Sequence, residues 1–389
     1  MTTKTAVIAI SRNGSDLARR LLASLPGADC TLFLDRRFIF GGENAVEFDL
    51  PVRPVVERAF DEYQRLVLFM PVGAAVRLLA DRLIHKHQDP AVVCVDDAGR
   101  FAISLLSGHV GGADELAREV ASILGGTPVI TSASHATGTL AADLLGKEFG
   151  WTLAAPNTVV TRVSAAVING EPVGVFQSTG EKAWWPEDRP LPGNIEIFQS
   201  LEALASSACV AALLITDETD PDGIATLEAS GKNMLVYRPR SLVVGMGCRK
   251  GVPGEELDQL LAATFQRHGL ALESIGCIAT AEIKQDEPGL MELAEKYGVE
   301  VRCFGADELN GMFQADGGNP PNPPLVKGGE YAGLPALLAR DPSSAPHRLV
   351  GVWGVSEPAA LLASGAAGLL VAKEKSARAT VAVARKVFG

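Results

Sequence analysis

The chain has 389 residues, 21% of them charged, and a formal net charge of −11. This length exceeds one ordinary hydrophobic core, so we expect two or three domains. The acidic balance argues against a nucleic-acid partner, because phosphate neutralisation needs a basic surface, but a local basic pocket can still bind an anionic small molecule. No apolar run reaches the ~18 residues of a membrane span, and the N-terminus lacks a signal-peptide pattern, so we expect a cytoplasmic protein without membrane contact.

The six cysteines are scattered and form no Cys-x-x-Cys pair. The sequence therefore indicates neither a zinc ribbon nor a disulfide framework, and most thiols should be reduced and buried. Cys248 differs because it follows a predicted glycine turn. His85 and His87 could offer two imidazoles to a metal ion, but no carboxylate stands in a helpful pattern. A solvated helix end is the better prediction there, and we expect no metal site in the protein.

The first third of the chain alternates short apolar runs with amphipathic stretches, beginning with a strand at 5–10 and a helix at 11–25. Runs of Val, Ile, Leu and Phe without alternation fit strands covered on both faces, as in a parallel sheet. A tight turn at 96–100 predicts that the next run folds back as a hairpin. We expect residues 1–133 to form an α/β domain of the Rossmann or flavodoxin type, with a mainly parallel sheet.

Residues 134–240 form a less distinctive middle α/β region, with three predicted strands and a loop carrying Trp184 and Trp185. These side chains could stack on a flat ligand, but we favour a role in covering a domain junction. A third α/β domain, residues 241–389, opens with a strand, a glycine turn and a helix that has proline in its first turn. The Gly- and Pro-rich segment 314–333 should be a mobile loop within it.

The stretch SLLSGHVGGADELA, residues 104–117, places reactive groups in a turn between a strand and a helix. Its glycines would let backbone N–H groups approach an anion at the helix start: Gly108, Gly111 and Gly112. His109 stands where a general base is needed, with Ser107 and Asp114 nearby. On spacing alone, a capped turn with His109 as an ordinary turn residue is the better interpretation. No Gly-x-Ser-x-Gly motif occurs, which argues against an esterase of the α/β-hydrolase type.

Two other turns follow predicted strands in the first domain. The segment 132–146 places His135 before a helix, and His135 would face His109 if their strands were neighbours. Helix capping is again the better interpretation of that segment. The segment 71–79 begins where a strand ends, and Gly73 permits close backbone approach to a large ligand.

In the third domain, GMGCRKG at 245–251 is close to a dinucleotide-binding fingerprint, but its third glycine comes one residue late and the expected acidic residue is missing. Arg249 and Lys250 favour carboxylate or phosphate recognition instead. Two later loops add further cations and hydroxyls, although solvated surface charge explains each loop singly. The candidate binding residues of this domain are Gly247, Cys248, Arg249, Thr280, Glu282, Lys284, Ser356, Lys373, Lys375 and Ser376.

Taken together, these stretches resemble the CbiG family of cobalamin-biosynthesis proteins. In the N-terminal half the resemblance rests on LVLFMPVGAAVRLLA, AVVCVDDAGRFAISLLSGHVGGADELA and PVITSASHATG. In the C-terminal half it rests on VVGMGCRKG, IATAEIKQDEPGL and GVWGVSEPAALLASGAAGLLVAKEKSARATVAVAR. The last group is also similar to the CobE family, so the third domain is expected to be a CobE-like module. The resemblance covers nearly the whole chain, and the middle region is its least distinctive part.

The resemblance implies a hydrolase of the anaerobic cobalamin pathway that acts on cobalt-precorrin-5A, a cobalt-bearing tetrapyrrole. A former meso carbon of this substrate is held in a lactone with a ring acetate. Water opens the lactone, and the two-carbon unit leaves as acetaldehyde. The resemblance implies no cofactor of the protein's own, because the cobalt arrives with the substrate.

Within this family reaction, we expect His109 to activate the attacking water, with Asp114 or Ser107 orienting the imidazole. The oxyanion would be held by backbone N–H groups of Gly111 and Gly112. Lys284 or Lys373 would bind peripheral carboxylates of the substrate.

Two alternatives stay open at this stage. A carrier that passes labile tetrapyrrole intermediates between enzymes would bind substrate without changing it. A flavodoxin-like or dinucleotide-binding oxidoreductase would follow from the α/β pattern alone, and the irregular glycine motif argues against it. Hand-over to other pathway enzymes and a homodimer are both compatible with the sequence.

Overall fold

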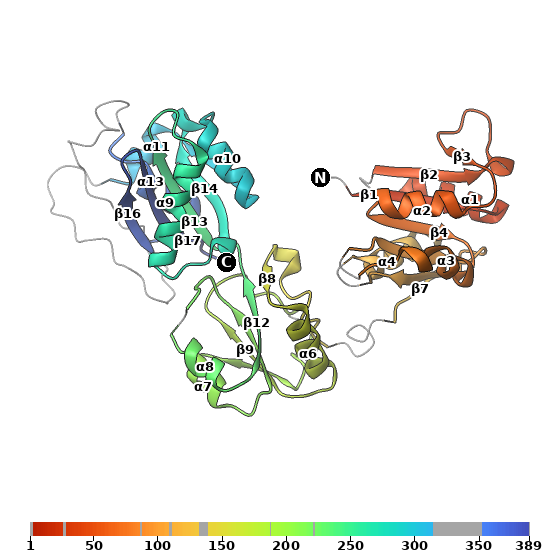
Figure 1. Cartoon of the computed structure of the whole chain (residues 1–389), viewed down its shortest axis with the longest axis horizontal. Coiled ribbons are helices and arrows are strands. Elements are labelled where there is room, and N and C mark those ends of the chain that lie inside the picture. Colours follow the sequence, from red (N-terminus) through yellow and green to blue (C-terminus); the bar gives the residue numbers. More distant parts are fainter. Residues whose placement is uncertain are drawn as a thin grey trace. The chain divides into compact units, whose positions relative to one another are not determined.

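The structure is a computed structural model. It describes residues 3–25, 29–85, 88–108, 111–131, 139–186, 188–220, 222–313 and 352–388. The chain divides into two compact units, Met1–Thr139 and Leu140–Gly389. Within the described residues, the first unit contains one seven-stranded sheet, and the second contains two five-stranded sheets (Figure 1). The division into three domains proposed above stays a prediction.

The sheet of the first unit has the order β3-β2-β1-β4-β5-β6-β7. Its strands are β1 (Lys4–Ala9), β2 (Asp29–Asp35), β3 (Val46–Phe48), β4 (Arg65–Phe69), β5 (Ala91–Val95), β6 (Phe101–Leu106) and β7 (Thr127–Val129). Every neighbouring pair is parallel except β5 and β6, which form the predicted antiparallel hairpin. The prediction of an α/β fold with a mainly parallel sheet is therefore confirmed for this unit.

Helices cover both faces of this sheet, which explains why its strands are apolar throughout. One core lies under α1 (Arg12–Ser24) and α4 (Ala113–Leu124), and the other lies under α2 (Arg53–Glu62) and α3 (Val72–Leu79). Ser11 caps α1 by accepting a hydrogen bond from the Gly14 N–H at 3.0 Å. Such a cap satisfies one of the backbone donors left free at a helix start.

The β5–β6 hairpin separates two predicted sites of the first unit. Because β6 runs against β5, the turn that follows β6 lies at the edge of the sheet where β1, β4 and β5 begin. The Ser107 hydroxyl donates to the carbonyl of Asp89, just before β5, at 2.9 Å. Gly73 follows β4 and so lies at the opposite edge of the sheet. The structure therefore does not bring Gly73 together with the turn at 107–112.

The middle sheet has the order β10-β9-β11-β12-β8. Its strands are β8 (Thr152–Ala154), β9 (Val173–Gln177), β10 (Ile195–Phe198), β11 (Ala211–Ile215) and β12 (Asn233–Arg238), and only β8 pairs antiparallel. Helix α6 (Asn157–Ile168) covers one face, while α7 (Leu201–Ser206) and α8 (Ile224–Ala229) cover the other. Trp184 is buried in the α6-side core and donates to Gln177 Oε1 at 2.8 Å. It therefore belongs to the core of the middle region, and neither predicted role of this tryptophan fits.

The third sheet has the order β15-β14-β13-β17-β16. Its strands are β13 (Leu242–Cys248), β14 (Ile275–Ala281), β15 (Glu300–Phe304), β16 (Val371–Lys375) and β17 (Ala379–Arg385). The first three are parallel, whereas β17 runs against β13 and β16 runs against β17. Helices α9 (Gly254–Arg267) and α10 (Pro288–Tyr297) cover one face. Helix α13 (Ser356–Ser364) covers the other face, next to α11 (Ala306–Gly311).

Three sequence predictions about this sheet need correction. Gly247 and Cys248 belong to β13, so the turn begins after Cys248 rather than before it. Lys373 and Lys375 lie in the edge strand β16, not in a loop. The apolar run RLVGVWG at 348–354 also predicts a strand, but the part of it that the structure describes, 352–354, is not a strand. The predicted mobile loop at 314–333 lies outside the described residues.

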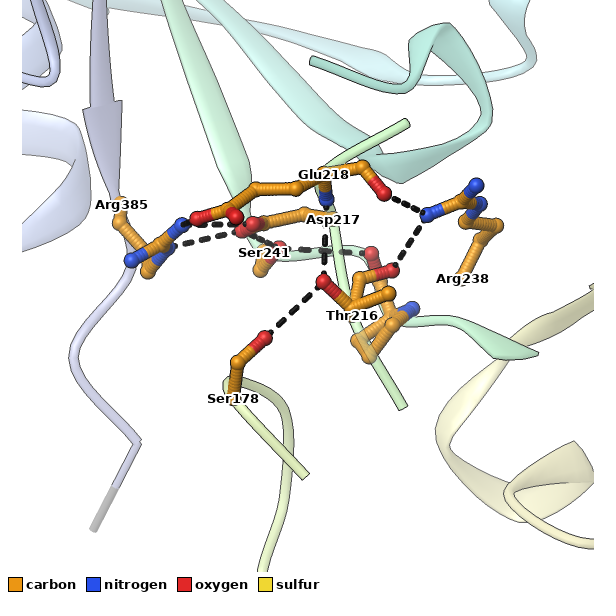
Figure 2. Close-up of polar contacts among 8 residues, drawn as sticks. Ser178, Thr216, Asp217, Glu218, Arg238, Ser241 and Arg385 are labelled. Atoms are coloured by element: carbon orange, nitrogen blue, oxygen red, sulfur yellow. Dashed lines mark hydrogen bonds and ion pairs between the residues drawn. The ribbon is translucent and has the colours of Figure 1, made fainter. Parts of the chain in front are cut away.

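A buried ion pair joins the middle sheet to the third sheet (Figure 2). Asp217 follows β11, and its carboxylate is fully buried. Arg385, at the end of β17, donates to its two oxygens at 2.6 and 2.8 Å. The Ser241 hydroxyl donates to the same carboxylate at 2.6 Å. The backbone of Asp217 also accepts from the Ala271 N–H at 2.8 Å. The carboxyl edge of the middle sheet thus abuts the edge at which β13 begins.

None of the helices in the described residues is long and apolar enough to cross a membrane.

Candidate functional site

Asp114 is the best-defined predicted site residue of the first unit. It lies in the first turn of α4 with 4% of its surface exposed, and the Ser104 hydroxyl donates to its Oδ1 at 2.6 Å. Its backbone N–H donates to the Gly108 carbonyl at 3.1 Å, which folds the turn back over the helix start. A Cβ at Gly108 would lie 2.6 Å from Asp114 Oδ1, so the turn requires glycine there. Sequence reasoning missed Ser104, whose only signal is a hydroxyl in an apolar strand.

Ser107 has a strained backbone at the start of the same turn. Its φ of 55° is the only positive value for a non-glycine residue among those that the structure describes. Such strain is often found at functional sites, where the surrounding structure must compensate for it. A Cβ at Gly111 would lie 2.4 Å from Ser107 Cβ, so the close approach of the backbone at Gly111 to Ser107 requires glycine. Because its hydroxyl donates to the Asp89 carbonyl, Ser107 anchors the turn, and its role beside His109 stays a prediction.

The helix start next to this turn has fewer free donors than expected. Gly112 is the N-cap residue of α4, with φ of 85° and no side-chain cap. The N–H groups of Ala113 and Asp114 donate to the carbonyls of Ser107 and Gly108 at 3.2 and 3.1 Å. Oxyanion binding by the Gly111 and Gly112 amides therefore stays a prediction. His109 and His135 lie outside the described residues.

A second candidate site lies at the carboxyl edge of the third sheet. The Arg249 N–H donates to the Arg378 carbonyl at 2.9 Å, which joins the turn after β13 to the hairpin turn between β16 and β17. Ser376 stabilises that hairpin turn, because its hydroxyl accepts from the N–H groups of Arg378 and Ala379 at 3.3 and 3.0 Å. The predicted basic segments around Arg249 and around Ser376 are therefore in contact, which joins two of the three predicted basic loops.

Glu287 links the third basic loop to the same turn. Its Oε1 accepts from the Gly251 N–H at 2.5 Å, and its Oε2 accepts from Lys284 Nζ at 2.8 Å. The hydrogen bond from Lys284, with the Gly251 N–H, holds the pKa of the Glu287 carboxyl below its ordinary value despite burial. Glu287 was missed in the sequence, although its spacing of three residues from Lys284 was a usable signal. Lys284 is thus an internal ion-pair partner, whereas Glu282 beside it is exposed.

The remaining predicted residues of this edge differ in their access to a ligand. Burial raises the pKa of the Cys248 thiol, even though the Lys284 charge acts in the opposite direction, so this thiol is not an activated nucleophile. Thr280 is fully buried and donates to the Met246 carbonyl at 2.8 Å, which makes it part of the sheet. The side chains of Arg249, Lys373 and Lys375 are exposed and form no ion pair with the described part of the chain.

Fold and site together define an α/β protein with a polar, strained turn in its first unit and a basic sheet edge in its second. Three family models match the chain. They are Cobalamin synthesis G N-terminal at residues 54–135, Cobalamin biosynthesis central region at 140–239, and Cobalamin synthesis G C-terminus at 242–327 and 331–384.

Curated relatives support the same assignment. The cobalt-precorrin-5A hydrolase of Priestia megaterium is 37% identical over 382 residues, which cover 97% of this chain and 94% of that protein. The cobalt-precorrin-5A hydrolase of Salmonella typhimurium is 31% identical, with 78% of this chain and 82% of that protein covered. Protein CobE of a Sinorhizobium species is 28% identical over 144 residues, covering 37% of this chain and 79% of that protein. The chain belongs to the CbiG family, and both predicted resemblances are confirmed.

Proposed function

We propose that this protein is a cobalt-precorrin-5A hydrolase of the cobalamin pathway, which opens the lactone of its tetrapyrrole substrate and releases acetaldehyde. The observation that carries this proposal is the 37% identity to the Priestia megaterium hydrolase over 97% of the chain. A carrier without catalysis is not favoured, because two curated relatives that cover most of the chain are named as hydrolases.

The chemistry needs a base, an oxyanion site and a path for two bond cleavages. In the proposed mechanism His109 takes a proton from water as its oxygen attacks the lactone carbonyl, and the Gly111 and Gly112 amides hold the resulting oxyanion. Cleavage of the carbon–oxygen bond leaves a ring acetate and a hydroxyethyl group. Loss of the hydroxyl proton then releases acetaldehyde, and the electron pair of the broken carbon–carbon bond passes to the macrocycle.

The structure around Asp114 supports its place in this mechanism. A general base needs a fixed partner that sets its orientation and tautomer. Asp114 is buried, accepts a hydrogen bond from Ser104, and follows His109 by five residues in the sequence. Ser107 fits the task less well, since its hydroxyl proton is committed to the Asp89 carbonyl.

Substrate recognition is proposed at the basic edge of the third sheet. A cation binds a carboxylate best when no internal acid already neutralises it. Arg249, Lys373 and Lys375 meet this condition among the described residues, whereas Lys284 is paired with Glu287. The roles of His135 and Gly73 in binding, hand-over to other enzymes, a homodimer and a cytoplasmic location stay predictions. No cofactor is proposed, because the cobalt belongs to the substrate.

The test is incubation of the protein with cobalt-precorrin-5A. The acetaldehyde released is trapped and quantified, and the mass of the tetrapyrrole is measured by mass spectrometry. The proposal expects one acetaldehyde for each tetrapyrrole that loses the two-carbon unit. Bound but unaltered substrate would support a carrier and contradict the hydrolase.

A further inference from the structure

Ser356 is a buried hydroxyl without a partner at the start of a helix. It is the first residue of α13, it is 1% exposed, and its Oγ has no hydrogen bond in the described part of the chain. Side chains of a helix tilt toward its N-terminus, so this hydroxyl lies at the N-terminal end of α13. The nine-residue helix has no side-chain cap there, and its first N–H groups lack helical partners. A buried polar atom without a partner needs an explanation, and a missing ligand is one.

The start of α13 approaches β13 closely at Gly245. A Cβ at Gly245 would lie 1.8 Å from the Ser356 carbonyl oxygen, whereas a Cβ at Gly247 would lie 3.4 Å from Val355 Cβ, in ordinary contact with the residue before the helix. The helix therefore begins over the last residues of β13, next to the carboxyl edge of the parallel strands. In open α/β sheets this edge is the usual place for ligands.

The unpaired Lys375 lies on the same face of the sheet. Glu374 points to the α9 face, because its carboxylate accepts from the Thr264 hydroxyl at 2.7 Å. Side chains alternate along a strand, so Lys375, which pairs regularly with Thr380 of β17, points to the other face, which α13 covers. The Lys373 N–H donates to Glu357 Oε1 at 3.1 Å, and this bond ties β16 to the first turn of α13. The one acid of that turn is thus held by the strand backbone.

We propose that the start of α13 binds a carboxylate of the tetrapyrrole substrate. The Ser356 hydroxyl and the backbone N–H groups of Ser356 and Glu357 donate hydrogen bonds, and Lys375 supplies the opposite charge. The rest of the first turn does not take part, because Pro358 has no N–H and the Ala359 N–H donates to the Val355 carbonyl. This assignment rests on the proposed function, since that function supplies a substrate rich in carboxylates. It gives the buried Ser356 hydroxyl a partner.

Other buried hydroxyls without partners provide a contrast. Ser274 is fully buried and its Oγ is also unpartnered, but it lies just before β14, at the opposite edge of the same sheet. Ser164 lies in the interior of α6. Neither residue lies at the N-terminus of an uncapped α-helix, so neither is expected to bind a ligand. Ser274 is therefore a matched control.

The test compares Ser356→Ala with Ser274→Ala in the full chain. An absorbance titration measures cobalt-precorrin-5A binding, a turnover assay measures acetaldehyde release, and a thermal unfolding curve measures stability. We expect Ser356→Ala to raise the substrate Kd about tenfold with kcat nearly unchanged, because a charge-assisted hydrogen bond is lost. Its melting temperature should not fall, since the hydroxyl makes no hydrogen bond in the described residues. Ser274→Ala should bind substrate as the wild type does.

A second variant tests the charge. Lys375→Ala should also raise the Kd, and its deficit should shrink in high salt because the ion pair is partly screened. The proposal would be overturned if Ser356→Ala bound substrate with unchanged affinity. An equal loss of affinity in Ser274→Ala, or a fall in the melting temperature of Ser356→Ala that accounts for its loss of affinity, would also overturn it. The titration does not depend on turnover. A wild type that binds substrate without releasing acetaldehyde would contradict the hydrolase while leaving this site intact.

Discussion

The two sheets of the second unit differ in how the polar groups at their carboxyl edges are paired. In the middle sheet the strand order reverses between β9 and β11, the usual place for a ligand in an α/β sheet. There Ser178 donates to Thr216, and Asp217 binds Arg385 and Ser241 of the third sheet (Figure 2). At the carboxyl edge of the third sheet, by contrast, Ser356 has no partner and Lys375 has no ion pair in the described residues.

This difference teaches that an acid or hydroxyl at a strand end does not by itself mark a ligand site. Asp217 has the residue type and position of a binding group, yet partners from the same chain use both of its oxygens. What separates the two edges is the state of their charged groups, because Asp217 is paired within the protein and Lys375 is not paired with any described residue. Hydroxyls do not separate them, since Thr179 Oγ1 after β9 also has no partner in the described residues. The Asp217–Arg385 pair thus joins the middle region to the third sheet, and the proposed binding site is on the third sheet itself.

The largest expected effect is on the joint between the two sheets. Arg385→Leu leaves the fully buried Asp217 carboxylate with the Ser241 hydroxyl as its one remaining side-chain partner among the described residues, which should cost about 3–5 kcal/mol of folding free energy. Urea unfolding of the full chain measures this loss. Arg378→Leu, which removes the exposed pair with Glu256, is the control and should have little effect. Equal effects of the two variants would contradict the role given to the joint.

A smaller effect is expected at the contact between α13 and β13. Gly245→Ala places a methyl group 1.8 Å from the Ser356 carbonyl, so the helix must move, at a cost of about 1–3 kcal/mol. Substrate affinity should fall as well, because the start of α13 shifts. Gly311→Ala serves as the control, since a Cβ there meets nothing within 4 Å. Wild-type melting and affinity in Gly245→Ala would show that α13 does not depend on this approach.

In the first unit, Ser104→Ala removes the hydroxyl that donates to the buried Asp114 carboxylate. The loss of such a bond should destabilise the unit by about 1–3 kcal/mol and lower the rate of acetaldehyde release. Ser104→Thr keeps the hydroxyl and should restore the rate. If the alanine variant turns over at the wild-type rate, Asp114 does not need this partner.

The smallest effect concerns pH and the Glu287 carboxyl. Its folded pKa lies below the unfolded value of about 4.3, because Lys284 and the Gly251 N–H donate to it. Glu287 therefore contributes stability above the unfolded pKa, and this contribution is lost as the pH falls through the folded pKa. Unfolding curves of wild type and Glu287→Gln should differ at pH 7 and converge in acid. A difference that does not change with pH would contradict the ion pair.

Much of the fold was predictable because it depends on local patterns. Apolar runs gave the buried parallel strands, and the tight turn after β5 gave the hairpin with β6. The consequence of that hairpin, which places Gly73 and the 107–112 turn at opposite edges, follows only once the strand order is known. Strand β16 is not predictable in this way, because charged residues of an edge strand, such as Lys373 and Lys375, have no apolar pattern.

The polar contacts of the candidate sites were harder to predict. Asp217 and Arg385 are 168 residues apart, and no local pattern links them. The pairing of Lys284 with Glu287 was visible in the spacing, but its bond to Gly251 depends on the contact between two turns. Ser104 and Asp114 meet because α4 folds back over β6. Long-range contacts of this kind depend on the packed sheet, which composition and periodicity do not specify.

The central claim is that catalysis depends on His109 while the third sheet supplies a separate binding site. The most direct test measures cobalt-precorrin-5A binding and acetaldehyde release in His109→Ala and wild type side by side. The account predicts that His109→Ala binds the substrate with nearly wild-type affinity and releases almost no acetaldehyde. Retained turnover, or loss of binding and turnover together, would contradict it.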